Sequence, residues 1–143
     1  MDHEAPNHSS IHKINVVFSD CLRLLTNNKR TDHAKIEDML KTLGWLSLNQ
    51  LNAETRLIEA WKITHDENYC LNDIIKQKEK NVYSTRSNNQ TFLNPGEECK
   101  KSKNSFAGPT AKIWNKAPSD VKSAPKLTQA RKAIREFVKT LPI

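Results

Sequence analysis

The sequence predicts an all-α protein, an irregular bundle of five or six helices with a long polar loop near residues 80–104. Two observations lead to this prediction. Apolar residues recur at spacings of three and four in several separate stretches, which is the period of an amphipathic helix. The chain also has only 3 glycines among its 143 residues, whereas β-rich chains usually need more glycine-based turns and more β-branched alternation.

The first helix is expected to begin near Ile11, after a loose tail at residues 1–10. From there to Leu25 the apolar positions follow the helical period. Asn27 and Asn28 interrupt the pattern, so a turn is predicted there. These residues therefore form the first helix of an N-terminal helical lobe, which we expect to span residues 11–79.

The second helix should carry three apolar residues on one face, namely Ile36, Met39 and Leu40. Either Thr31 or Asp32 can cap its start, because both side chains can accept a hydrogen bond from a free backbone N–H. Gly44 is expected to end it, since glycine accepts the left-handed conformation that follows the last turn.

A third helix is predicted over about residues 48–64, and its start has a recognisable signature. Ser47 and Gln50 form a capping-box pair, in which each side chain satisfies a backbone N–H of the other. Leu46 and Leu51 flank this pair as a hydrophobic staple. The residues expected to face inward are Leu51, Leu57, Ile58 and Trp61. A short fourth helix is suggested by Leu71, Ile74 and Ile75.

Residues 80–104 are poor in apolar side chains and rich in Asn, Ser, Lys and Thr, which predicts a long loop between two lobes. Helical signals return in a C-terminal lobe at residues 105–143. Pro118 should stop its first helix, and Pro125 precedes the last one, for which Thr128 is a candidate cap. Trp114 is expected in the core, because large aromatic side chains are mostly buried.

The net charge of +7 is concentrated at the C-terminal end of the chain. Residues 1–98 hold 12 basic and 14 acidic side chains, whereas residues 99–143 hold 11 basic and only 2 acidic ones. The last third is therefore a basic module attached to a nearly neutral one. Such a module would attract phosphate groups or anionic lipid, and the attraction should weaken as salt is added.

Four motifs, in order, resemble the region that follows the thumb in reverse transcriptases of non-LTR retrotransposons. They are CLRLLT at residues 21–26, LGWLSLNQ at residues 43–50, YSTR at residues 83–86, and SF at residues 105–106 followed by AKIWNKAP at residues 111–118. The resemblance continues through Val121, Ala124 and Leu127, so it covers nearly the whole chain. Ala117 stands where the family usually has Leu, and Ala130 where it usually has Phe. Residues 94–103 replace a more arginine-rich segment.

The resemblance implies a helical, non-catalytic C-terminal piece of a retrotransposon reverse transcriptase, a region that accompanies the polymerase and contacts template RNA or target DNA. The polymerase itself is missing. Its chemistry needs clustered carboxylates that hold two metal ions, and this sequence has no adjacent aspartates. Three scattered glycines cannot form a phosphate-binding loop. We therefore expect no enzymatic activity and no cofactor.

Neither a metal site nor a disulfide framework is predicted. His65, Asp66, Glu67 and Cys70 lack the short paired spacing of a structural zinc site. The three cysteines are widely spaced, which predicts inert thiols in a reducing compartment, the cytoplasm or the nucleus. No apolar run approaches the roughly 20 residues of a membrane span, so no membrane partner is expected.

The basic residues are the candidate site, as a surface that neutralises phosphates without reading sequence. RNA or DNA is the expected partner, with Tyr83 and Arg86 adding contacts to an unpaired base. The basic candidates are Lys100, Lys101, Lys103, Lys112, Lys116, Arg131, Lys132, Arg135 and Lys139. The alternative is a domesticated fragment that acts as a protein-interaction or structural module and has no nucleic-acid role; a solvated lysine face would then need no ligand.

Overall fold

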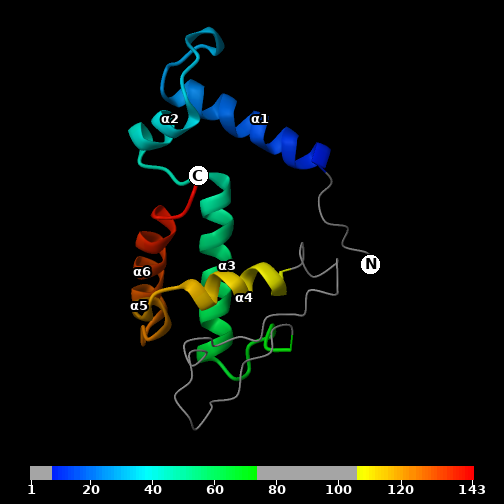
Figure 1. The fold of residues 1–143 in the computed structure, drawn as a ribbon, viewed down its shortest axis with the longest axis vertical. Coiled ribbons are helices and arrows are strands. Elements are labelled where there is room, and N and C mark those ends of the chain that lie inside the picture. The colour runs from blue at the N-terminus through cyan, green and yellow to red at the C-terminus, as the bar shows by residue number, and fades with distance from the viewer. Residues whose placement is uncertain (1–7, 74–105) are drawn as a thin grey trace. The chain divides into compact units, whose positions relative to one another are not determined.

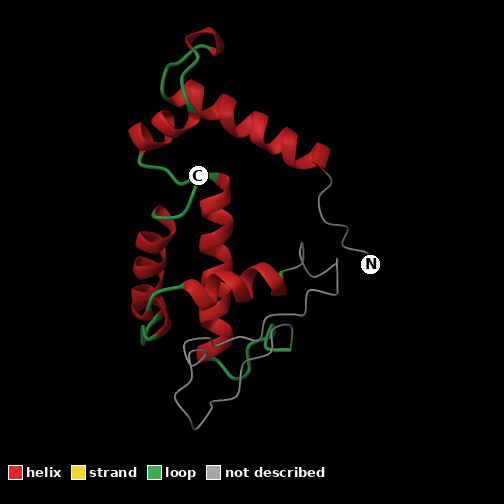
Figure 2. Ribbon diagram, in the orientation of Figure 1, coloured by secondary structure: helices red, strands yellow, loops and turns green. Residues whose placement is uncertain are grey.

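The computed structural model describes residues 8–73 and 106–143, and every regular element in these residues is a helix (Figures 1 and 2). The α-helices are α1 (His8–Leu25), α2 (Ile36–Leu43), α3 (Leu48–His65), α4 (Ala107–Lys116), α5 (Ser119–Lys122) and α6 (Leu127–Lys139), with one 3₁₀ turn, η1 (Arg30–Asp32). The described residues contain no strand, which confirms the predicted all-α class.

The chain divides into two compact units, and the division falls inside α3. The N-terminal unit comprises Met1–Leu51 with Pro142–Ile143, and the C-terminal unit comprises Asn52–Leu141. This differs from the predicted lobes at residues 11–79 and 105–143, because most of α3 packs with the helices that follow it. The predicted loop at residues 80–104 lies outside the described residues. So do Ile74 and Ile75 of the predicted fourth helix, while Leu71 lies in a turn.

In the N-terminal unit, α1 and α2 pack around a small apolar core. Leu22 of α1 is fully buried, and Met39 and Leu40 of α2 are 2% exposed. The partly buried side chains against this cluster are Phe18, Ala34 and Leu43. Gly44 ends α2 as predicted, with a left-handed φ of 65° and its N–H directed to the carbonyls of Leu40 and Lys41. Ile36, expected on the same inward face, is 39% exposed.

The predicted caps of α2 and α6 are wrong. Lys35, with extended backbone, precedes α2, and Thr31 and Asp32 lie in η1 instead. The Asp32 carboxylate accepts the backbone N–H of Lys29 at 2.6 Å, so it satisfies a donor three residues earlier in the chain. At α6 the residue before the helix is Lys126, and Thr128 is already helical and exposed.

The start of α3 confirms the predicted capping box. The backbone N–H of Ser47 donates to the Gln50 side-chain oxygen at 3.0 Å. The backbone N–H of Gln50 donates in return to the Ser47 hydroxyl at 3.2 Å. Both side chains are buried, and the free N–H groups of a helix start need such partners where water is excluded. In the predicted staple Leu46 is buried, while Leu51 is 38% exposed.

The C-terminal unit builds its core where α3, α4, α5 and α6 meet. In Figure 1, α4 crosses α3 and α6 runs beside it. Its core is made of small residues around a few large ones: Ala53, Leu57, Ala60, Ile63, Ala111, Trp114, Ala117, Val121, Ala124, Ala130, Ile134 and Val138. Trp114 is 1% exposed, as predicted. Ile58 and Trp61, expected to face inward, are only partly buried.

Two side chains of α3 bind the later helices directly. Arg56 donates to the Phe106 carbonyl at 3.0 Å and to the Thr110 hydroxyl at 3.1 Å, and its guanidinium lies 5.6 Å from the Phe106 ring centre. Partial burial lowers the pKa of Arg56. The Trp61 indole N–H donates to the Ala124 carbonyl at 3.1 Å. These bonds explain why α3 belongs mainly to the C-terminal unit.

Candidate nucleic-acid interface

Helix α6 has an apolar side that is buried and a basic side that is exposed. Successive residues turn by about 100°, so Arg131, Arg135 and Lys139, at spacings of four, lie on one face, with Lys132 beside them. The structure shows all four as exposed. The neighbouring face, about 100° around the helix, carries Ala130, Ile134 and Val138, each 0% exposed. Core packing therefore holds this basic face outward along the helix.

Two of these four cations already have acidic partners. Arg135 pairs with Glu54 of α3 at 3.4 Å, and Lys139 pairs with Glu136 at 2.9 Å. The hydrogen bond from Lys139 is the main reason that the pKa of Glu136 is lowered, with a smaller contribution from the charge of Lys132. Lys139 and Glu136 are both more than half exposed, and exposed pairs contribute little to stability, so a phosphate group can compete for Lys139 at small cost. The Glu54 side chain is only 15% exposed, so Arg135 is held more firmly.

The other two cations of this face are less engaged. Arg131 and Lys132 form no ion pair within the described residues. The charge of Lys132 reaches Glu136 only as a minor influence on its pKa. Of the four, Arg131 and Lys132 are therefore the side chains most available to an added anion.

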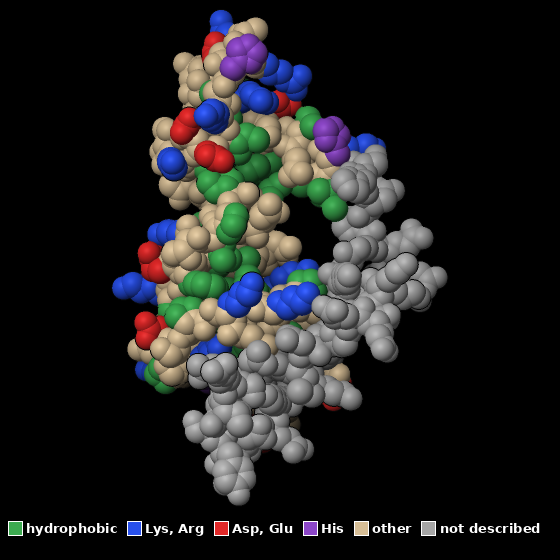
Figure 3. Space-filling view, in the orientation of Figure 1, with side chains coloured by type: hydrophobic (Ala, Val, Ile, Leu, Met, Phe, Trp, Pro, Cys, Tyr) green, Lys and Arg blue, Asp and Glu red, His purple; other side chains and the backbone are tan. Residues whose placement is uncertain are grey.

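Helix α4 contributes a second pair of cations. Lys112 and Lys116 are exposed four residues apart, and neither forms an ion pair within the described part of the chain. Figure 3 shows Lys and Arg side chains over α4 on the face in view, and others near α6 interspersed with acidic side chains. Both helices belong to the C-terminal unit, so their basic residues are presented by one folded body.

Two lysines that were not singled out from the sequence lie between these helices in the chain. Lys126 is exposed directly before α6 and adds to the basic surface. Lys122 is partly buried and donates to the Asn115 carbonyl at 3.2 Å, and burial lowers its pKa. Lys122 is therefore a structural residue. Lys126 lies outside the helical pattern of the sequence, so the only sequence signal for it was the large number of basic residues in this part of the chain.

The remaining predicted contacts lie outside the described residues. They are Lys100, Lys101 and Lys103, together with Tyr83 and Arg86. The candidate interface is therefore defined here by α4 and α6 alone.

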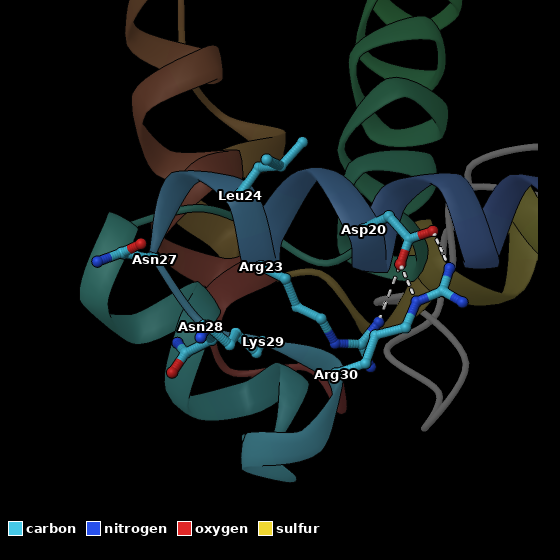
Figure 4. A pocket seen from close by; sticks show the side chains of 7 residues that line it. All are labelled: Asp20, Arg23, Leu24, Asn27, Asn28, Lys29 and Arg30. Atoms are coloured by element: carbon cyan, nitrogen blue, oxygen red, sulfur yellow. Dashed lines mark hydrogen bonds and ion pairs between the residues drawn. The ribbon is translucent and has the colours of Figure 1, made fainter.

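A hollow of about 350 Å³ in the N-terminal unit is another place where cations gather (Figure 4). It is lined by Asp20, Arg23, Leu24, Asn27, Asn28, Lys29 and Arg30. Asp20 binds Arg30 at 2.6 Å and Arg23 at 3.1 Å, and the hydrogen bond from Arg30 is the main reason that its pKa is lowered. Both arginines are thus directed to a carboxylate, so the cluster joins α1 to η1 rather than presenting cations to an anion.

The described residues contain no group of three or more His, Cys, Asp or Glu side chains that could hold a metal ion. Among the described helices none is both long and apolar enough to cross a membrane. Cys21 and Cys70 are free and exposed.

No protein-family model matches this chain, and neither a curated protein nor a solved structure matches it.

Proposed function

We propose that this chain is a non-catalytic nucleic-acid-binding module that contacts the phosphate backbone of RNA or DNA through α6 and α4. The observation that supports this most strongly is the α6 face of Arg131, Lys132, Arg135 and Lys139, held outward by a fully buried apolar face on the same helix. In residues 106–143 only Asp120 and Glu136 oppose eight basic side chains. A fixed cationic strip of this kind neutralises phosphates and releases their counterions.

The proposed binding is sequence-tolerant. Lysine and arginine side chains on an exposed helix face meet the charged backbone, which is the same for every sequence, and phosphate contacts position a protein without identifying bases. The motifs that resemble the post-thumb region of non-LTR retrotransposon reverse transcriptases support the same proposal, because that region accompanies a polymerase on its nucleic acid.

The competing interpretation is a protein-interaction module in which the lysines only keep the surface solvated. The two make opposite predictions. Binding to nucleic acid depends on the charges of α6 and falls with salt. A protein contact through an apolar face is indifferent to those charges and depends on the apolar side chains.

Fluorescence anisotropy with short labelled single strands of RNA and of DNA tests the proposal. The variant Arg131→Gln/Lys132→Gln removes two cations that form no ion pair with any described residue, and it should weaken binding to both strands equally. Lys35→Gln/Lys41→Gln is the matched control, because it removes the same charge from exposed positions in the N-terminal unit. Arg135→Gln alone should weaken binding less than removal of Arg131, since Arg135 already pairs with Glu54.

Two results would reject the proposal. One is a parent chain that binds neither strand at low salt. The other is an equal loss of affinity in the α6 variant and the matched control, which would show that only net charge matters and that α6 forms no site.

A further inference from the structure

Helix α1 carries an apolar face that its own unit leaves largely uncovered. Five large apolar side chains of this helix are between 47% and 82% exposed, namely Ile11, Ile14, Val17, Leu24 and Leu25. Helix α2 covers one edge only, at Leu22, which is fully buried. Scattered exposed apolar residues are normal, but a contiguous strip of them usually marks a contact surface.

The spacing of this strip is that of a helix-pairing seam. Ile14, Val17, Cys21 and Leu24 follow one another at intervals of three, four and three, the pattern of core positions in a coiled coil. Ile11 and Leu25 border the seam. The 18 residues of α1 extend for about 27 Å, which corresponds to about two and a half heptads. The surface is therefore shaped for another helix.

The described part of the C-terminal unit offers little apolar surface to this seam. Every large hydrophobic side chain that is exposed among the described residues lies in the N-terminal unit. A lipid surface also fits poorly, because helices that lie on membranes carry many lysines and arginines on their polar side. The polar side of α1 has only Lys13 and Arg23 as strong bases, and Asp20 opposes them.

Charge favours a second copy of the same unit. Residues 1–51 hold six basic and six acidic side chains, whereas the rest of the chain carries the whole net charge of +7. The four seam residues are uncharged, so the seam itself places no like charges in contact when two α1 helices pair. The apolar seam of α1 is thus separate from the basic surface of the C-terminal unit, whose positive charge would repel a second copy.

We propose that α1 pairs with α1 of a second copy of this chain, forming a weak homodimer through the seam Ile14, Val17, Cys21 and Leu24. A strip about 27 Å long and about 10 Å wide is smaller than the roughly 800 Å² per partner of a stable interface. The dimer should therefore form reversibly at micromolar or higher concentrations. The proposal does not depend on nucleic-acid binding, which uses other helices.

Sedimentation velocity over about 5 to about 500 µM protein tests it, a range that spans the expected weak association. The full chain is freed of nucleic acid, kept under reducing conditions so that Cys21 forms no disulfide, and measured in high salt to screen the repulsion between basic surfaces. The weight-average mass should rise with concentration from 16.4 kDa towards twice that value.

Two adjacent valines provide a matched pair of variants. Val17→Lys places a charge in the seam at a position 63% exposed, and Val16→Lys places the same charge on the other side of the helix at a position 40% exposed. Lysine forms helices at least as well as valine, so neither change should unfold α1. Val17→Lys should keep the chain monomeric at every concentration, and Val16→Lys should dimerise like the parent.

Several results would overturn the proposal. A parent chain that stays at 16.4 kDa throughout shows that the face is covered by its own chain or by a different partner. An equal effect of Val16→Lys and Val17→Lys shows that dimers form elsewhere. Circular dichroism of both variants, unchanged from the parent, confirms that lost dimerisation is not lost folding. Nucleic-acid binding measured on the same samples tests the proposed role of α6, so a failure of that proposal can be told apart from a failure of the dimer proposal.

Discussion

At the scale of single residues, the C-terminal unit depends on the largest side chain of a core that is rich in alanine. Six alanines are buried in its core, and Trp114, 1% exposed, is the largest side chain buried with them. Alanine leaves room for helices to approach closely, and the indole then fills the space between them. Ala117 and Ala130 are both buried at such positions.

Trp114→Ala should therefore lower the free energy of unfolding by roughly 3–5 kcal/mol, the usual cost of removing a large buried aromatic side chain. Trp45→Ala is the matched control, because Trp45 is 48% exposed and should change stability far less. Urea denaturation followed by circular dichroism measures both. If the Trp45 variant is as destabilised as the Trp114 variant, then the description of Trp114 as buried and Trp45 as exposed is wrong.

Ser47 is the second residue whose removal has a defined consequence. Its hydroxyl accepts a hydrogen bond from the Gln50 backbone N–H, and Ser47 is only 5% exposed, so water has little access to replace that bond. Ser47→Ala should cost about 0.5–2 kcal/mol, the range for an N-cap. In Ser19→Ala, the control, the lost bond runs to the Asn15 carbonyl within α1, and stability should change by no more than about 0.5 kcal/mol. Similar losses in both would contradict the role of the cap.

At the scale of elements, Asp20 connects α1 to η1 across ten residues of sequence. Its carboxylate accepts two bonds from Arg30, at 2.6 and 3.3 Å, and one from Arg23 of its own helix. The bond from Arg30 is the first cause of its lowered pKa. The ionised carboxylate is therefore the form that holds the turn after α1 in place.

This link predicts a pH dependence. Because the folded-state pKa of Asp20 lies below its ordinary value of 3.8, the stabilisation is complete above that value and is lost as pH falls through the folded-state pKa. Asp20→Asn should lower the melting temperature at neutral pH and approach the parent in strong acid. Asp73→Asn, at an exposed position, is the control. A difference between Asp20→Asn and the parent that grows as pH falls would contradict the prediction.

The elements also show which features can be predicted from sequence. The capping box at Ser47 and the glycine end of α2 are local, because the groups that interact are a few residues apart. The caps predicted at Asp32 and Thr128 are wrong, because α2 begins after Lys35 and α6 begins after Lys126, and neither lysine forms a side-chain cap hydrogen bond. The division inside α3 depends on bonds such as Trp61 to Ala124, which join residues 63 positions apart.

At the scale of the whole molecule, charge and exposed apolar surface are divided between the two units. The N-terminal unit has no net charge and carries every exposed large hydrophobic side chain among the described residues, whereas the rest of the chain carries +7. Periodicity predicted the basic face of α6. It could not predict that Arg135 pairs with Glu54, a residue 81 positions away, because that pair depends on how α3 and α6 pack.

The salt dependence of binding tests the proposed phosphate contacts most directly. For single strands, the logarithm of the affinity falls with the logarithm of salt by about 0.7 per phosphate neutralised. Measured between about 50 and about 200 mM salt, the slope for Arg131→Gln/Lys132→Gln should be shallower than that of the parent by about 1.4. The slope for Lys35→Gln/Lys41→Gln should equal that of the parent. Equal slopes for the parent and the α6 variant would contradict the account.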